Sequence, residues 1–206
     1  MPVLAELTAV DDAEGWRAAG FSVAGDGTCV LGDVVVRLEG GGHGLGITGW
    51  GFAGLERAEP IDGIPTTVVD GDRPEPVPHA NGTTSIDHVV VRSPDSRRTT
   101  AALETVGLPA KRARDIGRGM QQVFFRAGAV IVELVGPVEP GGDGPAGFYG
   151  LAVNVTDLDL TKDTLGELVT DPKDAVQPGR RIATLRTRDL GIATAIAFMS
   201  QPERRS

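Results

Sequence analysis

The sequence contains a single cysteine, Cys29, among 206 residues. One cysteine excludes an intrachain disulfide framework and a cysteine-rich zinc site, so we expect a small buried hydrophobe there. The N-terminal stretch lacks the basic region of a signal peptide, and Glu6, Asp11 and Asp12 interrupt its apolar residues. No apolar run reaches the ~18 residues that a membrane helix needs. We therefore expect a cytoplasmic protein without membrane contact.

Basic clusters are also scarce. The chain has 20 Lys and Arg against 28 Asp and Glu, a net charge of −8. A protein that binds the phosphate backbone of a nucleic acid needs a basic surface, so a nucleic-acid partner is not expected. A small-molecule ligand or another protein chain fits better. Glycine, by contrast, is abundant at 29 residues, which favours tight turns between short strands.

Three segments of the chain begin in a similar way. In the middle one, residues 85–92 alternate and end at Ser93-Pro94-Asp95, which predicts a strand that leads into a helix N-cap. A helix is expected over 97–106, ending at Gly107. Three further strands are expected at 108–114, 120–126 and 129–135. The order is β-α-β-β-β.

The other two segments repeat this order. The C-terminal one predicts a strand at 148–156, a helix at 158–168 capped by Asp157, and a closing hairpin of 180–187 and 191–199. The N-terminal one is shorter, with a helix over 13–19 and strands at 3–10, 21–25, 28–31 and 33–38. We expect a degenerate module over 1–55, a Pro-rich linker or wrapping loop over 56–84 and a two-module domain over 85–206.

Two ionisable residues, His88 and Glu133, each lie in the middle of a strand-like apolar run. An unpaired buried charge is very costly, so both side chains are expected to face water or a polar cavity. If the two strands belong to one sheet, the side chains could converge on one site.

A family resemblance follows from the middle segment. It is carried by Ile86-Asp87-His88-Val89-Val90-Val91 with Pro94-Asp95, Gly107-Leu108, Phe124-Phe125-Arg126 and Val132-Glu133-Leu134-Val135-Gly136-Pro137. This pattern resembles the vicinal-oxygen-chelate superfamily of glyoxalases, bleomycin-resistance proteins and extradiol dioxygenases. The resemblance is strong over 85–137, good over 148–199 and weak over 1–55. It implies an α+β fold in which βαβββ modules pair into a cupped, barrel-like mixed sheet around a ligand site, and it is compatible with a homodimer.

The resemblance also implies roles for the two ionisable residues. Metal-dependent members take one ligand from the first strand of each module and typically a Glu from the last, which match His88 and Glu133. The implied cofactor is a divalent metal, Zn, Ni, Fe or Mn, which can polarise a carbonyl and stabilise an enediolate. Alternatively, Glu133 acts as a general base.

The other modules depart from this pattern. Alignment of the segments puts Gly150 opposite His88 and Ile196 opposite Glu133 in the C-terminal module. In the N-terminal module Glu6 and Arg37 take these places; either they form an ion pair or both face water. One complete ligand pair is therefore expected. His43 and His79 lie on no matching strand, so the two-histidine, one-carboxylate triad of an extradiol dioxygenase is not expected.

Other residues are candidates for a substrate pocket. Gly150, Ala152 and Asn154 share one face of their strand and leave room for a ligand if that face lines the cup. Alternatively, the small residues only permit close packing. Arg92 shares the predicted face of His88 and either binds an acidic substrate group or lies at a solvated rim, where Arg126 is expected.

The segment Gly44-Leu45-Gly46-Ile47-Thr48-Gly49 fits a dinucleotide-binding fingerprint in form. Gly51, Gly54 and Pro60 interrupt the helix that should follow, so a glycine-rich hairpin or edge strand is the better prediction.

Together, these features predict a divergent glyoxalase-like enzyme that acts on a small carbonyl or vicinal-dioxygen compound, with a lyase or isomerase activity that a metal would assist. The alternative is a non-catalytic protein that sequesters an antibiotic or metabolite.

Overall fold

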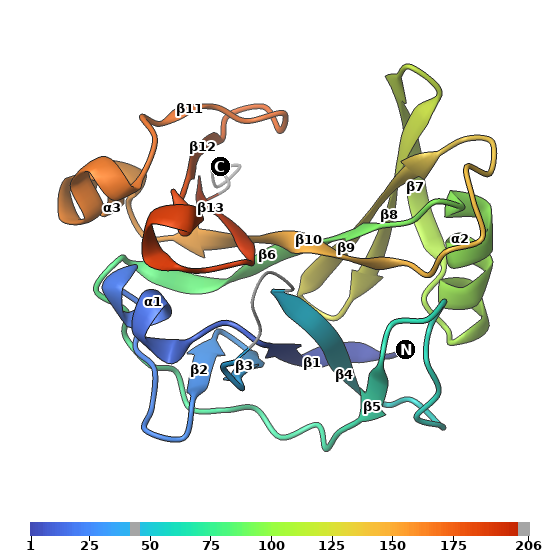
Figure 1. Cartoon of the computed structure of the whole chain (residues 1–206), viewed down its shortest axis with the longest axis horizontal. Coiled ribbons are helices and arrows are strands. Elements are labelled where there is room, and N and C mark those ends of the chain that lie inside the picture. Colours follow the sequence, from blue (N-terminus) through green and yellow to red (C-terminus); the bar gives the residue numbers. More distant parts are fainter. Residues whose placement is uncertain (42–45, 202–206) are drawn as a thin grey trace, which may run out of the picture.

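The computed structural model describes residues 1–41 and 46–201, which form two mixed β-sheets packed face to face (Figure 1). The five-stranded sheet has the order β2-β3-β1-β4-β5. Its strands are Val3–Ala9 (β1), Thr28–Leu31 (β2), Val34–Leu38 (β3), Ile47–Ala53 (β4) and Thr66–Val68 (β5). The α+β class expected from the sequence is confirmed.

The eight-stranded sheet has the order β11-β12-β13-β10-β6-β9-β8-β7. Its strands are Thr83–Arg92 (β6), Ala110–Gly117 (β7), Met120–Ala127 (β8), Val130–Pro137 (β9), Gly147–Val155 (β10), Lys173–Asp174 (β11), Arg181–Thr184 (β12) and Ala195–Ser200 (β13). The helices are Ala13–Ala18 (α1), Ser96–Thr105 (α2) and Leu158–Leu165 (α3), with 3₁₀ turns at Gly166–Leu168 (η1) and Thr187–Leu190 (η2). No helix in the described part of the chain is long and apolar enough to cross a membrane.

Two complete modules build the eight-stranded sheet. One is β6-α2-β7-β8-β9 and the other is β10-α3-β11-β12-β13. In each, the first strand pairs in parallel with the last, and the first strands β6 and β10 pair antiparallel at the centre. The expected pairing of βαβββ modules is thus confirmed. As predicted, Asp95 and Asp157 cap their helices, because each carboxylate accepts hydrogen bonds from two backbone N–H groups.

The five-stranded sheet follows the same plan in shortened form. Strand β1 is parallel to β3, β4 is parallel to β5, and β1 and β4 pair antiparallel at the centre. Strand β4 therefore opens a further module, which the sequence patterns did not reveal because its core contains Gly49 and Gly51. A Cβ atom on Gly51 would lie 3.0 Å or less from Thr67, Val69 and Glu6. Close packing keeps a glycine in this central strand.

A β-bulge interrupts the first strand of each of the four modules. The register skips Ala5, Thr48 and Tyr149 in three of these strands, and both Thr84 and Asp87 in β6. A bulge lets two consecutive residues face the same side of a sheet. In β6 it places Asp87 and His88 on one face, while Ile86 and Val89 point into the core.

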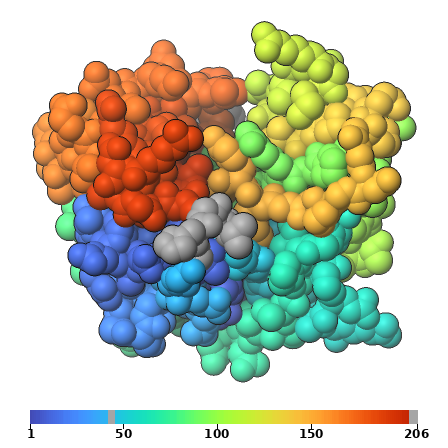
Figure 2. Space-filling model, viewed as in Figure 1, coloured from blue at the N-terminus to red at the C-terminus, as the bar shows by residue number. Residues whose placement is uncertain are grey.

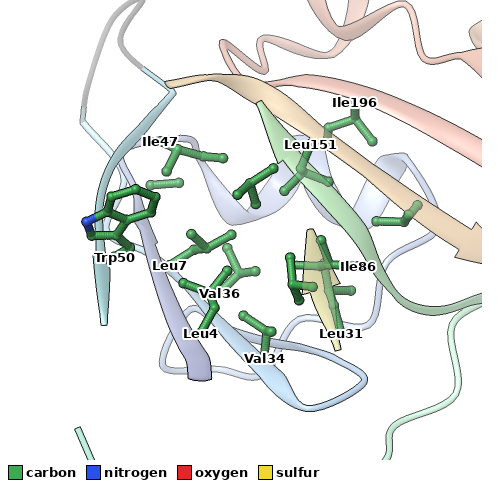
Figure 3. Packing of buried hydrophobic residues seen from close by; sticks show 14 of the residues in the cluster. Leu4, Leu7, Leu31, Val34, Val36, Ile47, Trp50, Ile86, Leu151 and Ile196 are labelled. Carbon is green, nitrogen blue, oxygen red and sulfur yellow. The ribbon is translucent and has the colours of Figure 1, made fainter. Parts of the chain in front are cut away.

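One hydrophobic core fills the space between the two sheets. Leu7 and Val36 of the five-stranded sheet lie across from Ile86, Leu151 and Ile196 of the eight-stranded sheet (Figure 3). Cys29 is fully buried in this core, as the sequence predicted, and burial raises the pKa of its thiol to about 12. The core includes residues from both sides of the proposed boundary between 1–55 and 85–206.

Residues 56–84 run from one sheet to the other and contribute the edge strand β5. Two buried polar side chains fix the end of this segment. His79 accepts the N–H of Ser22 at Nδ1, and its Nε2 lies 2.8 Å from the carbonyl of Val30. Asn81 donates to the carbonyl of Ala19 and accepts the N–H of Thr83.

Some element boundaries differ from the prediction. Residues 21–25 form no strand, and the expected helix over 158–168 changes to the 3₁₀ turn η1 at Gly166. The expected hairpin at the C-terminus is interrupted by η2, which ends at Gly191 with a φ of 68°. The dinucleotide-binding fingerprint does not lead into a helix, because β4 begins within it at Ile47. A strand was expected here, but at an edge of its sheet, and β4 lies between β1 and β5; Gly44 and Leu45 lie outside the described residues.

Candidate functional site

The eight-stranded sheet curves so that β7 and β8 rise at one end and β11 and β12 at the other (Figure 1). Figure 2 shows these two walls, yellow-green and orange, as separate masses with a recess between them. The opposite side of the sheet is covered by the five-stranded sheet. We call the side that carries His88 and Glu133 the concave face.

His88 and Glu133 meet on the concave face. Strands β6 and β9 are parallel neighbours, and Val90 pairs with Glu133. His88 lies two residues before Val90 and therefore on the same face of the sheet. The distance from His88 Nε2 to Glu133 Oε2 is 3.8 Å, and each side chain is 15% exposed. The pair is close enough to exchange a proton through a ligand and remains open to solvent.

Neighbouring groups orient both members of the pair. Asp87 Oδ2 lies 2.8 Å from His88 Nδ1. Because a carboxylate only accepts, this contact assigns a proton to Nδ1 and directs Nε2 toward Glu133. On the other side, Gln122 Nε2 donates to Glu133 Oε1 at 2.7 Å. The free oxygen of Glu133 therefore faces the free nitrogen of His88.

Arg180 holds Asp87 in place from the other module. Its Nη1 donates to Asp87 Oδ1 at 2.7 Å, its Nη2 to Asn154 Oδ1 at 2.6 Å, and its Nε to the carbonyl of Ser200. The Arg180 side chain is only 8% exposed. Burial opposes ionisation of Asp87, but the hydrogen bonds from His88 and Arg180 outweigh it and hold the pKa of Asp87 below its ordinary value. Asp87 thus stays charged beside the imidazole.

The sequence analysis missed Asp87, Arg180 and Gln122. Strict alternation along β6 would place Asp87 and His88 on opposite faces, and only the bulge brings them together. Arg180 lies in the turn just before β12, far from β6 in sequence. Gln122 was detectable, because it lies on the strand beside Glu133 and its amide can satisfy a carboxylate.

The residues proposed for a substrate pocket are on or near the concave face. Arg92 stacks over the ring of Tyr149, with its guanidinium carbon 4.0 Å from the ring centre. Ala152 is buried opposite His88, and Asn154 is engaged by Arg180. A Cβ atom on Gly150 would lie 2.1 Å from the carbonyl oxygen of Ala195, so this glycine permits a close strand approach. A role of these residues in substrate binding stays a prediction.

The register corrects one of the expected equivalences. In the third module, Val90 lies five residues before the helix cap Asp95 and pairs with Glu133. In the fourth, Ala152 lies five residues before the cap Asp157 and pairs with Ala197. Ala197, not Ile196, therefore occupies the place of Glu133, and Ile196 points into the core. The interruption by η2 explains the shift. Either way, this module has no acidic ligand there.

In the N-terminal module the expected equivalence agrees with the register. Glu6 pairs with Val35 and Thr8 with Arg37, the same spacing that relates His88 and Glu133. The two side chains form an ion pair, with Arg37 Nε 2.5 Å from Glu6 Oε2. Of the two alternatives left open by the sequence, pairing is the one observed.

A metal ion would find few donors in this site. Catalytic zinc sites typically take three protein ligands, whereas the equivalent positions of the paired modules supply His88, Glu133, Gly150 and Ala197. The described residues contain no group of three or more His, Cys, Asp or Glu side chains arranged to hold a metal. His79 uses both ring nitrogens elsewhere, and His43 lies outside the described residues. The donors that residues 1–41 and 46–201 of one chain place here thus do not fit a resident metal.

Two hollows lie outside this site. One of about 450 Å³ is lined by Phe21, Val23 and Thr28 beside α1 and β2. The other, of about 240 Å³, lies between the sheets and touches Leu4 and Ile86. Neither includes His88 or Glu133, whose side chains each keep 15% of their surface exposed on the concave face.

Comparison with known proteins identifies the fold. No protein-family model and no curated protein sequence matches the chain. The structure is similar to a mutant of 4-hydroxymandelate synthase from Streptomyces coelicolor, with 17% identity, coverage of 99% of this chain and 94% of that chain, and a TM-score of 0.65. It is also similar to a xylose isomerase-like TIM barrel/4-hydroxyphenylpyruvate dioxygenase fusion protein, with 11% identity, coverage of 99% and 50%, and a TM-score of 0.63.

Methylmalonyl-CoA epimerase from Mycobacterium tuberculosis matches 60% of this chain and 91% of its own, with 16% identity and a TM-score of 0.47. The chain has the fold of the vicinal-oxygen-chelate superfamily, as the sequence resemblance implied. At these identities the likeness establishes the fold alone.

Proposed function

We propose that the chain is a divergent glyoxalase-like enzyme that moves a proton on a small carbonyl compound, with Glu133 and His88 as the proton carriers. The observation that supports this most is the orientation of the pair. Asp87 and Gln122 each occupy one atom of a carrier, and the two remaining atoms, Nε2 and Oε2, face each other at 3.8 Å on an open surface. General acid–base catalysis needs such positioned groups within reach of one substrate.

In the proposed reaction, Glu133 takes a proton from the carbon next to the substrate carbonyl. The electron pair of the broken C–H bond moves to the carbonyl oxygen and gives an enolate. His88, protonated at both ring nitrogens and held at Nδ1 by Asp87, donates its Nε2 proton to that oxygen, so that an α-hydroxy carbonyl compound becomes an enediol. Neutral His88 then takes the proton of the other hydroxyl group, the C=O bond forms at that carbon, and protonated Glu133 returns its proton to the former carbonyl carbon. This completes an isomerisation and restores both carriers, and Arg180 acts only by positioning Asp87.

A divalent ion would bind His88 and Glu133 if it bound here. Because the described residues supply only these two donors, no step of the proposal depends on it. A second copy of the chain in a homodimer is a further source of donors, which light scattering combined with metal analysis would test.

The test is hydrogen–deuterium exchange in D₂O, followed by NMR, on a panel of small α-hydroxy and α-keto carbonyl compounds. We expect exchange with the natural protein and a loss of at least 100-fold in Glu133→Gln, since a positioned general base typically contributes about that much or more. The matched control is Glu139→Gln, which removes a carboxylate that is exposed beside Arg97.

Binding of a compound without exchange, unchanged by Glu133→Gln, would instead support the alternative of a non-catalytic binding protein. Exchange that persists in both variants would contradict the roles of His88 and Glu133.

A further inference from the structure

Arg92, one of the residues proposed for the substrate pocket, shares the concave side with three further arginines: Arg112, Arg114 and Arg126. None of them forms an ion pair with another residue in the described part of the chain. The protein carries a net charge of −8. A group of unpaired cations on one wall therefore reverses the overall charge locally, and such a reversal attracts anions.

The register places Arg126 on the face of His88. Arg126 pairs with Ile131 across β8 and β9, and Ile131 pairs with His88 across β9 and β6. Residues that pair directly point to the same side of a sheet. The side chain of Arg126 thus stands two strands away from His88 on the concave face, about 10 Å along the sheet at 4.8 Å a strand.

Strand β7 adds two more arginines to this wall. Arg112 pairs with Phe124, which pairs with Glu133. Arg114 pairs with Gln122, whose amide reaches Glu133. Both arginines therefore share the face of the proton carriers. Strand β7 is an edge strand of the sheet, and on it Arg112 is exposed and Arg114 half-buried.

Arg92 lies on the floor beside this wall. It stacks on Tyr149, and stacking fixes the guanidinium plane while its N–H groups remain free to donate. Of the acidic groups nearest to the floor, Asp87 is paired with Arg180, and Glu133 accepts a hydrogen bond from Gln122 and lies 3.8 Å from His88. The free positive charge thus lies on the side of β7 and β8.

We propose that the wall of Arg112, Arg114 and Arg126 binds an anionic oxygen group of the substrate, a carboxylate or a phosphate. Planar guanidinium groups donate pairs of hydrogen bonds to either anion. The distances along the sheet suit a compact ligand, with its anionic end on this wall and its carbonyl over His88 and Glu133. The placement of the carbonyl rests on the proposed function, whereas anion binding by the wall does not.

The test measures binding of inorganic phosphate and of malonate by isothermal titration calorimetry at low and high salt. We expect the natural protein to bind at least one of them, more weakly at high salt, and the double variant Arg112→Ala/Arg114→Ala to lose at least tenfold in affinity. The matched control is Arg186→Ala/Arg188→Ala, which removes two exposed charges at η2, beside α1. The control should keep affinity within twofold, and the tighter probe identifies the anion class.

Absence of binding by the natural protein, or equal losses in both double variants, would overturn the proposal. Circular dichroism and the thermal midpoint confirm that the variants fold, which is expected because β7 packs on one neighbour only. Anion binding with no proton exchange on any carbonyl compound would leave this inference standing and remove the proposed function. Exchange on carbonyl compounds by a protein that binds neither phosphate nor malonate would support the proposed function and overturn this inference.

Discussion

Arg37 and Glu6 hold in the first module the two positions that Glu133 and His88 hold in the third. The chemistry is reversed, because the carboxylate lies on the first strand and the cation on the last. The two charges pair with each other at 2.5 Å, between Arg37 Nε and Glu6 Oε2. The N-terminal sheet thus keeps the geometry of the site without its proton chemistry.

Asp87→Asn is expected to destabilise the protein. The substitution leaves Arg180 buried without its counter-ion, and breaking a buried ion pair costs about 3–5 kcal/mol. Urea unfolding at pH 7 measures the loss. Glu6→Gln is the control: its partner Arg37 is 54% exposed, and such surface pairs contribute ~1 kcal/mol or less. Equal losses in the two variants would contradict the assigned burial of the Asp87–Arg180 pair.

The same carboxylate predicts an acid limit. The pKa of Asp87 is lower in the folded protein than in the unfolded chain, so the unfolded state takes up the proton first. Its contribution is complete above the unfolded value of about 3.9 and is lost as the pH falls through the lower folded value. The unfolding free energy of Asp87→Asn should therefore depend less on pH below about 4 than that of the natural protein.

His79 predicts a second dependence on pH, nearer neutrality. Burial lowers its pKa, against the bond to the Val30 carbonyl, which raises it. With its pKa below 6.5 in the folded state, His79 contributes stability that is complete above that value and is lost as the pH falls below it. One proton gives a slope of up to about 1.4 kcal/mol per pH unit.

Thermal unfolding between pH 7.5 and 5 measures this slope. His79→Gln should flatten it, while His88→Gln should retain it, because His79 is still present in that variant. A steep slope in His79→Gln would assign the effect to other groups.

Gly150→Ala is expected to unfold the protein more easily, by about 2 kcal/mol or more, because the new methyl group meets backbone and overpacking is costly. Gly147 provides the matched control on the same strand: no atom outside its neighbours lies within 4 Å of a Cβ atom there. Denaturant midpoints compare the two alanine variants. Equal midpoints would show that β13 yields at Ala195.

Metal analysis tests the donor count at His88 and Glu133. Protein purified without chelator and reloaded with Zn, Ni, Fe or Mn should hold less than about a tenth of an equivalent, since the part of the chain that the structure describes offers two donors where three are usual. Stoichiometric metal that is lost in His88→Gln would reverse this conclusion and support the cofactor that the resemblance implies.

The complete modules could be predicted from the sequence because local signals agree there. Alternation in β6, the Asp95 cap and Gly107 all indicate the same order of elements, and tertiary packing did not override them. Strand β4 was not predictable in this way. Its glycines lower strand propensity, and only the close approach of Thr67 and Glu6 explains why they are needed.

The candidate site likewise has a part that could be predicted from the sequence and a part that could not. The meeting of His88 and Glu133 follows from two alternating strands in one sheet. The partners of this pair depend on features without a local signal: the bulge at Asp87, which breaks alternation, and the turn that brings Arg180 from the next module. Both the bulge and the position of Arg180 depend on pairing between strands that are distant in sequence, and no local pattern in a single sequence indicates that pairing.

The close contact between Gly150 and β13 limits which substitutions could add metal ligands or proton carriers to the concave face. A histidine at position 150 would have to displace the carbonyl of Ala195, and a carboxylate would still be needed at Ala197 on the strand that had moved. No single substitution can add a symmetrical second pair of donors to the concave face. The asymmetry of the site is therefore fixed in the backbone, and new specificity is more accessible through the arginines of the opposite wall.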